Sequence, residues 1–155
     1  MPPGFVKRRS MDKRTLPNDV LLGEVAAVLR DGREAVITPS GNSMLPFIRG
    51  GVDRVAIRRQ ADVAVGDIVL VQAGERYLLH RIVAREGDAL TLMGDGNLAG
   101  TERCTVTDVL GTVTEIIRPS GRRRAPGRAR FWRALKPVRR YLLAIYKRLF
   151  IRNTI

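Results

Sequence analysis

Between Glu34 and Arg118 the chain is a succession of short apolar segments separated by turns that contain glycine, and this pattern limits the fold most strongly. Most segments are rich in Val, Ile and Leu. Regular short strands divided by turn residues are typical of antiparallel β-barrels and sandwiches. We therefore expect a mainly β fold, a partly open barrel, with strands at 34–38, 52–58, 67–72, 76–86, 89–93 and 109–118.

The segments on either side of this β region have a different pattern. Before it, Asn18 or Asp19 can cap an amphipathic helix that Asp31-Gly32 ends. After it comes a stretch rich in Pro, Gly and Arg, followed by a second helical pattern. The expected parts are a flexible basic leader (1–15), an N-terminal helix (16–33), a β domain (34–118), a linker (119–128) and a basic amphipathic helical tail (129–155).

The tail holds the whole net charge. Residues 1–117 have 15 basic and 15 acidic side chains, whereas 118–155 have 13 basic and none that is acidic. We expect three partners for the tail, in falling order: its own domain, an anionic membrane surface and nucleic acid. Lipid is favoured over nucleic acid because phosphate binding needs no apolar stripe. That stripe comprises Trp132, Leu135, Val138, Leu142, Ile145 and Leu149, with Pro137 beginning a second helix.

Composition also limits the cofactors and the compartment. A single Cys and a single His leave too few ligands for a disulfide framework or a structural zinc site, so we expect no metal and no cofactor. No apolar stretch approaches the ~20 residues of a membrane span. The N-terminus has no apolar signal region. We expect a cytoplasmic protein, with peripheral attachment to the inner membrane face as an option.

Three polar motifs stand out among the apolar segments: SGNSMLP at 40–46, LHRI at 79–82 and GDGN at 94–97. Ser43 lies in a glycine-containing loop that can present a nucleophile. His80 lies in an apolar strand that would keep its imidazole neutral and basic. Asp95 lies in a turn and could orient that imidazole. Taken singly, each motif is more often a turn or a satisfied core residue than a catalytic one.

The order of the motifs changes this balance. SGNSMLPFIRGG, VGDIVLV, LLHRIV and LMGDGN follow one another in the arrangement of the peptidase core shared by type I signal peptidases and SOS-response repressors, which the chain resembles over roughly 36–113. The resemblance implies that barrel type, with Ser43 as nucleophile and His80 as base. The chain most resembles the signal peptidases that use His as the base. It has no lysine between Lys13 and Lys136, so a Ser–Lys dyad is excluded within the domain.

The chain also departs from its apparent relatives. Gly41 stands where bacterial signal peptidases have an oxyanion-hole serine, so the backbone N–H groups of Asn42 and Ser43 would hold the oxyanion. Met44 and Pro46 are candidates for the substrate groove. Endoplasmic-reticulum enzymes have further acids just past the Gly-Asp turn. The nearest such acid here is Glu102, and the third catalytic member is left between Asp95 and, second, Asp108.

We therefore expect a serine endopeptidase resembling signal peptidase I, which cleaves an extended leader-like or signal-like peptide with Ser43 and His80. The alternative is a non-catalytic module of the same fold, attached by its basic tail to an anionic membrane or to nucleic acid. A third hypothesis pairs Cys104 with His80 as a thiol nucleophile. It is the weakest, because no glycine-rich loop presents Cys104.

Overall fold

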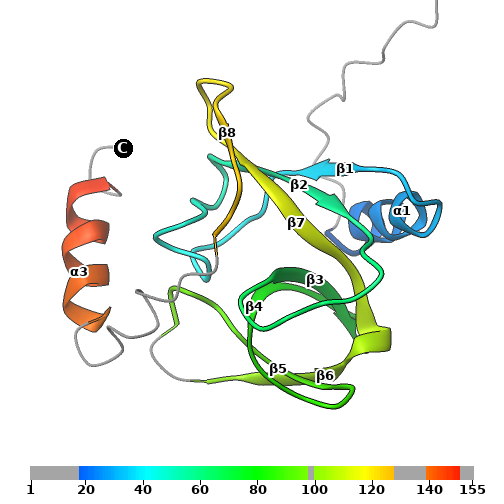
Figure 1. The fold of residues 1–155 in the computed structure, drawn as a ribbon. Coiled ribbons are helices and arrows are strands. Elements are labelled where there is room, and N and C mark those ends of the chain that lie inside the picture. The colour runs from blue at the N-terminus through cyan, green and yellow to red at the C-terminus, as the bar shows by residue number, and fades with distance from the viewer. Residues whose placement is uncertain (1–17, 98–99, 128–138, 151–155) are drawn as a thin grey trace, which may run out of the picture.

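The computed structural model describes residues 18–97, 100–127 and 139–150 (Figure 1). The leader and the first part of the tail, including Trp132, Leu135, Pro137 and Val138, lie outside these ranges. The helices are α1 (Asn18–Arg30), the 3-10 turn η1 (Val106–Asp108) and α3 (Arg139–Phe150). The strands are β1 (Ala35–Ile37), β2 (Arg54–Arg58), β3 (Ile68–Ala73), β4 (Arg76–Glu86), β5 (Ala89–Met93), β6 (Glu102–Thr105), β7 (Val109–Ile117) and β8 (Arg123–Arg124).

All the strands belong to one antiparallel sheet. Its order is β1-β2-β7-β3-β4-β5-β6, with β8 paired to β7. The two edge strands, β1 and β6, do not pair with each other, so the sheet curls without closing (Figure 1). This arrangement confirms the predicted mainly β fold with a partly open barrel.

The segment expected to be a linker, 119–128, is partly a strand. A tight turn at Gly121, whose φ is +87°, reverses the chain, and β8 returns along the end of β7. The turn is closed by hydrogen bonds from Gly121 N to Arg118 O (2.8 Å) and from Arg118 N to Arg122 O (2.9 Å). The Pro- and Gly-rich composition therefore marks a hairpin turn here, and the linker prediction is corrected for this stretch.

The side chains of the central strands point alternately to the two faces of the sheet, and this divides the core into two clusters. Ile68 and Leu70 of β3 pack in one cluster with Leu29 of α1, whereas Val69 and Val71 pack in the other. Because successive side chains of a strand point to opposite faces, a strand that is apolar at every position is buried on both. Each such buried side chain contributes about 1.5–3 kcal/mol. The central strands therefore form a stable frame for the site.

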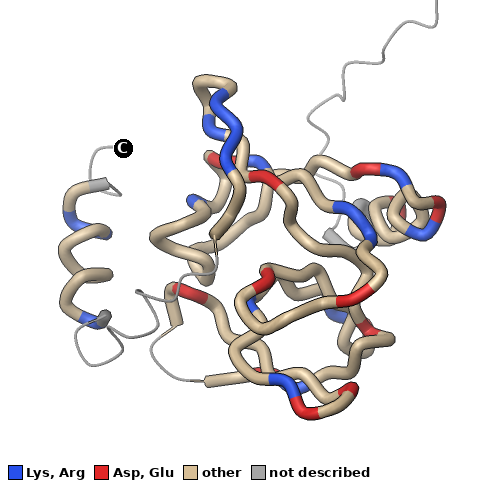
Figure 2. The backbone as a smooth tube through the Cα atoms, viewed as in Figure 1, with Lys and Arg blue, Asp and Glu red and all other residues tan. Residues whose placement is uncertain are grey.

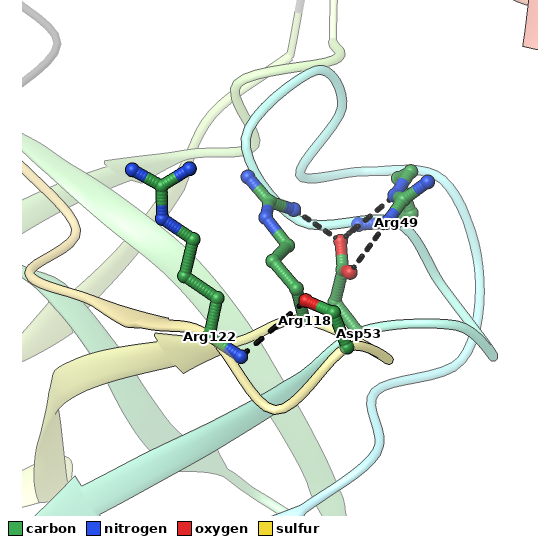
Figure 3. A network of polar contacts seen from close by, with 5 residues as sticks. Arg49, Asp53, Arg118 and Arg122 are labelled. Carbon is green, nitrogen blue, oxygen red and sulfur yellow. Dashed lines mark hydrogen bonds and ion pairs between the residues drawn. The ribbon is translucent and has the colours of Figure 1, made fainter.

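The buried carboxylate of Asp53 links Arg49, which follows the SGNSMLP loop (40–46), to Arg118, which follows β7. Asp53 is fully buried and accepts hydrogen bonds from Arg49 N (2.8 Å), Arg49 Nη2 (3.0 Å) and Arg118 Nη1 (Figure 3). Burial alone would raise the pKa of the Asp53 carboxyl. The hydrogen bonds from Arg49 and the charge of Arg118 outweigh burial and hold that pKa below its usual range.

Helix α3 packs on the domain beside the SGNSMLP loop. The residues of α3 that make this contact do not belong to the predicted apolar stripe. Leu143 is 3% exposed and contacts Leu45, with Phe47 and Tyr146 packed beside them. Burial raises the pKa of the Tyr146 phenol. Leu142 and Ile145, which belong to the predicted stripe, are exposed. No helix in the described ranges is long and apolar enough to cross a membrane.

The Asp53 network predicts how stability depends on pH. Replacing Asp53 with Asn leaves the two arginines without their carboxylate, and we expect the free energy of unfolding at neutral pH to fall by about 2–3 kcal/mol. The carboxylate contributes fully above its unfolded-state pKa of about 3.9 and loses its contribution as pH falls toward the lower folded-state pKa. Urea denaturation of wild type and D53N should therefore converge below about pH 4.

Asp62→Asn is the matched control, because the Asp62 carboxylate is exposed and pairs with Arg85 at the surface. It should leave stability nearly unchanged at neutral pH. A difference between D53N and wild type that stayed constant down to pH ~3 would contradict this account.

Candidate active site

The Ser43 loop is fixed by its buried neighbours. Met44 and Leu45 are 4% and 2% exposed, and Ile48 N and Phe47 N both donate to Met44 O at 3.0 and 3.1 Å. Ser43 itself is half-buried. The buried apolar residues that directly follow Ser43 therefore hold the loop against the core, and Ser43 itself lies near the surface of the domain.

Backbone crossings hold the start of this loop. Gly41 has a φ of +81°, in the region that favours glycine. A Cβ atom on Gly50 would lie 1.8 Å from Gly41 O, so only glycine fits where the two backbones cross. The two glycines fix the shape of the loop from both ends.

The GDGN turn (94–97) packs its backbone directly against the backbone of the Ser43 loop. Gly96 N donates a hydrogen bond to Ser43 O at 2.8 Å. A Cβ atom on Gly94 would lie 2.4 Å from Ser43 O, and one on Gly96 would lie 2.5 Å from Asn42 O. Glycine is needed at both positions because the backbones approach so closely. Neither Gly94 nor Gly96 has a positive φ.

Asp95, in the same turn, is bound to Arg81. Both residues are buried, at 3% and 0% exposed. Arg81 Nε lies 2.8 Å from Asp95 Oδ1, and Arg81 Nη2 lies 2.8 Å from Asp95 Oδ2, which is a bidentate ion pair. Arg81 Nη1 also donates to Gly66 O (2.7 Å) and Gly127 O (2.8 Å), and the guanidinium lies 5.4 Å from the centre of the Phe47 ring.

The carboxylate on His80 belongs to Glu102. His80 is 6% exposed, and its Nδ1 lies 2.9 Å from Glu102 Oε2. The sequence-based assignment of this position to Asp95 is therefore corrected, because both oxygens of Asp95 accept from Arg81. Asp108, the second candidate, accepts instead from Thr105 N (2.8 Å) at the start of η1.

Sheet register explains how Glu102 reaches His80. The β4–β5 ladder begins at the pair of Arg81 with Met93, so His80 lies just past the end of β5. β6 begins at Glu102, which is paired with Leu92. Ile82, Leu92 and Glu102 are successive cross-strand partners and share one face of the sheet, and His80 is two residues from Ile82 on that face. Glu102 is the nearest acid past the Gly-Asp turn, where the resemblance places further acids, and the structure brings its carboxylate to His80.

Glu102 determines which ring nitrogen of His80 can accept a proton. A carboxylate on Nδ1 favours the neutral tautomer with its proton on that nitrogen. The lone pair is then on Nε2, which is the atom available to a hydroxyl group. This is the tautomer that a general base requires.

Ser43 and His80 line the same cavity, whose volume is about 540 Å³. Ser40 and Gly41 also line it, together with apolar residues of α1, β1, β3 and β4 and the charged residues Glu75 and Arg76. Met44, one of the two expected groove residues, lines this cavity, whereas Pro46 is not among its lining residues. Within the described part of the chain, the backbone N–H groups of Asn42 and Ser43 donate no hydrogen bond.

The structure does not favour the thiol alternative. Cys104 is half-buried on β6 and packs beside the second core cluster. Burial raises the pKa of the Cys104 thiol, whereas a thiol nucleophile needs a lowered one. Across residues 18–97, 100–127 and 139–150, no group of three His, Cys, Asp or Glu side chains could hold a metal ion.

Comparison with family models gives an independent result. Residues 6–114, well over half of the chain, match the model described as peptidase S24-like, and the match contains Ser43, His80 and Glu102. No curated protein matches the chain significantly. With the open antiparallel barrel and the order of its motifs, this match shows that the chain belongs to the peptidase S24-like family.

Proposed function

We propose that this protein is a serine endopeptidase in which Ser43 is the nucleophile, His80 the general base and Glu102 the residue that orients His80. One observation carries the proposal: His80 has a carboxylate 2.9 Å from Nδ1 and shares a cavity with Ser43. Membership of a peptidase family supports the same reaction class. A serine, a neutral imidazole and a carboxylate are the parts that acyl transfer needs.

The reaction would follow the usual course of serine peptidases. Ser43 Oγ attacks the carbonyl carbon of the scissile amide while its proton passes to His80 Nε2. The resulting imidazolium, stabilised by Glu102, gives that proton to the leaving amine as the C–N bond breaks. Water then attacks the acyl-enzyme, His80 takes a proton from the water, and Ser43 Oγ leaves with a proton returned from His80.

The developing oxyanion needs donors that are not already occupied. The N–H groups of Asn42 and Ser43, which donate no hydrogen bond among the described residues, support the predicted backbone oxyanion hole. They lie on the loop that Gly94 and Gly96 hold at close range. A preformed loop of this kind can stabilise the tetrahedral intermediate without reorganising.

The substrate class follows from the strand beside the cavity. Residues 76–80 of β4 pair with β3 on one side, and their other edge pairs with no described strand because β5 ends at Met93, opposite Arg81. Tyr77, Leu79 and His80 of this stretch line the cavity. An open strand edge beside a nucleophile suits an extended peptide that adds as a further strand. We propose such a peptide, leader-like or signal-like, as the substrate.

Asp95 has a different part in this proposal from the one that the sequence suggested. Through Arg81 it fixes the turn under the Ser43 loop to the strand that holds His80. It is therefore a positioning residue, whereas Glu102 contacts the base directly. The two carboxylates should respond differently to substitution.

Ser43→Ala should abolish cleavage, lowering kcat/KM by at least about 10³-fold, because the variant lacks the hydroxyl that attacks the scissile carbonyl. The assay incubates the purified full chain with a set of extended peptides and identifies products by mass spectrometry. Ser120→Ala, in the turn before β8, is the matched control and should cut at the wild-type rate. A wild-type protein that cuts no peptide, or an S43A variant that cuts normally, would support the non-catalytic module instead.

Glu102→Gln should lower kcat/KM by about 10²–10⁴-fold, because His80 loses the group that fixes its tautomer and stabilises its charged form. The melting temperature should change little, since the Glu102 side chain is 38% exposed. Glu86→Gln, an exposed carboxylate on the same strand as His80, is the control. Equal activity of E102Q and E86Q would show that the contact with His80 has no catalytic part.

Asp95→Asn should lower stability first. Removing one partner of a buried ion pair costs about 3–5 kcal/mol, which urea denaturation would measure. At a temperature where circular dichroism shows D95N folded, its kcat/KM should fall less than that of E102Q, because His80 keeps its carboxylate. A D95N variant as stable as wild type but as inactive as E102Q would return Asp95 to the catalytic position.

A further inference from the structure

Helix α3 has a wide apolar arc, and the domain covers only part of it. Leu143 and Tyr146 pack against the domain beside Leu45. The rest of the arc is exposed: Tyr141 by 60%, Leu142 by 39%, Ile145 by 55% and Leu149 by 60%. At 100° per residue these four side chains fall within an arc of about 100° next to the docked one. Scattered surface apolar residues are common, but four on one helix face form a patch.

Basic residues border this exposed arc. Arg140, Lys147 and Arg148 lie on the remaining side of α3, and the helix contains no acidic residue. Figure 2 shows blue and no red along it. The Arg140 guanidinium lies 5.2 Å from the centre of the Tyr141 ring, at the border between the charged and apolar arcs. Tyrosine with a basic neighbour is typical of helices at a membrane–water interface.

The charge of the whole C-terminal region selects among the occupants of the arc. No acidic residue follows Glu115, whereas 13 basic residues do. Two copies meeting through this face would bring their cationic helices together. Nucleic acid would satisfy the charge but leave the apolar arc uncovered. An anionic lipid surface satisfies both, because the arc enters the acyl boundary while the basic side chains reach the headgroups.

We propose that α3 binds an anionic lipid bilayer in the plane of its surface, through the arc of Tyr141, Leu142, Ile145 and Leu149 with Arg140, Lys147 and Arg148 at the headgroups. Leu143 and Tyr146 stay packed on the domain, so the protein can bind the bilayer without breaking the contact between α3 and the domain. The proposal goes beyond the peptidase reaction and does not depend on it. Its test therefore uses no activity measurement.

The experiment is flotation of the full chain with vesicles of phosphatidylcholine and phosphatidylglycerol, compared with vesicles of phosphatidylcholine alone. Wild type should float with the anionic vesicles only, and added salt should weaken binding. The double variant I145S/L149S should bind at least about ten-fold more weakly, because two exposed apolar side chains are lost from the contact. Lys147→Gln and Arg148→Gln should each weaken binding about five-fold.

Val52→Ser is the matched control, since Val52 is 40% exposed and lies outside α3. It should float as wild type does, and circular dichroism should show every variant folded because the changed side chains are exposed. Three outcomes would overturn the proposal. The first is that wild type floats with neither kind of vesicle, and the second is that I145S/L149S floats as wild type does. The third is that the protein forms a dimer in sedimentation, or a complex in a DNA-binding assay, but does not bind anionic vesicles.

Discussion

The buried ion pair between Arg81 and Asp95 is the interaction on which the site depends. Four segments meet at Arg81: the GDGN turn through Asp95, the turn before β3 through Gly66 O, the segment after β8 through Gly127 O, and the Ser43 loop through Phe47. Burying a guanidinium is costly unless its donors are satisfied, and here Nε, Nη1 and Nη2 all have acceptors. The pair therefore specifies how these segments lie relative to one another.

The position of Arg81 next to His80 follows from strand geometry. Adjacent residues of β4 point to opposite faces of the sheet, so His80 faces Glu102 while Arg81 faces Asp95. Two neighbouring residues thus position the His80 imidazole and anchor the GDGN turn that holds the Ser43 loop. A one-residue shift in the register of β4 would exchange these faces and lose both contacts.

The sequence predicts the fold best where burial is strongest. β3, β4, β5 and β7 contain buried Val, Ile and Leu, which is the signal that a periodicity argument uses. The local signal is weaker for the other two strands: β6 has no fully buried residue, and β8, which was not among the expected strands, consists of two exposed arginines. Their strand form depends on pairing with β5 and β7, which no local pattern reveals.

The site shows the same limit. The motifs single out Ser43 and His80 as a candidate pair, whereas the contact between Glu102 and His80 depends on two strand pairings that the motifs do not reveal. A usable signal for Asp95 was nevertheless present: Arg81 lies in an apolar strand, and a buried arginine requires a carboxylate. Gly94 and Gly96, beside Asp95, have no positive φ, and glycine is needed there because two backbones approach closely.

The tail shows why two predicted partners need not exclude each other. Leu142, Ile145 and Leu149 belong to the predicted stripe, yet Leu143 and Tyr146 dock α3 on the domain and these three side chains remain exposed. The docked residues hold the helix against Leu45, two residues from Ser43. A bilayer bound by the exposed arc would therefore lie at a fixed orientation to the cavity that Ser43 and His80 line. Of the peptides that fit an open strand edge, such an enzyme would favour those that are held at a membrane surface.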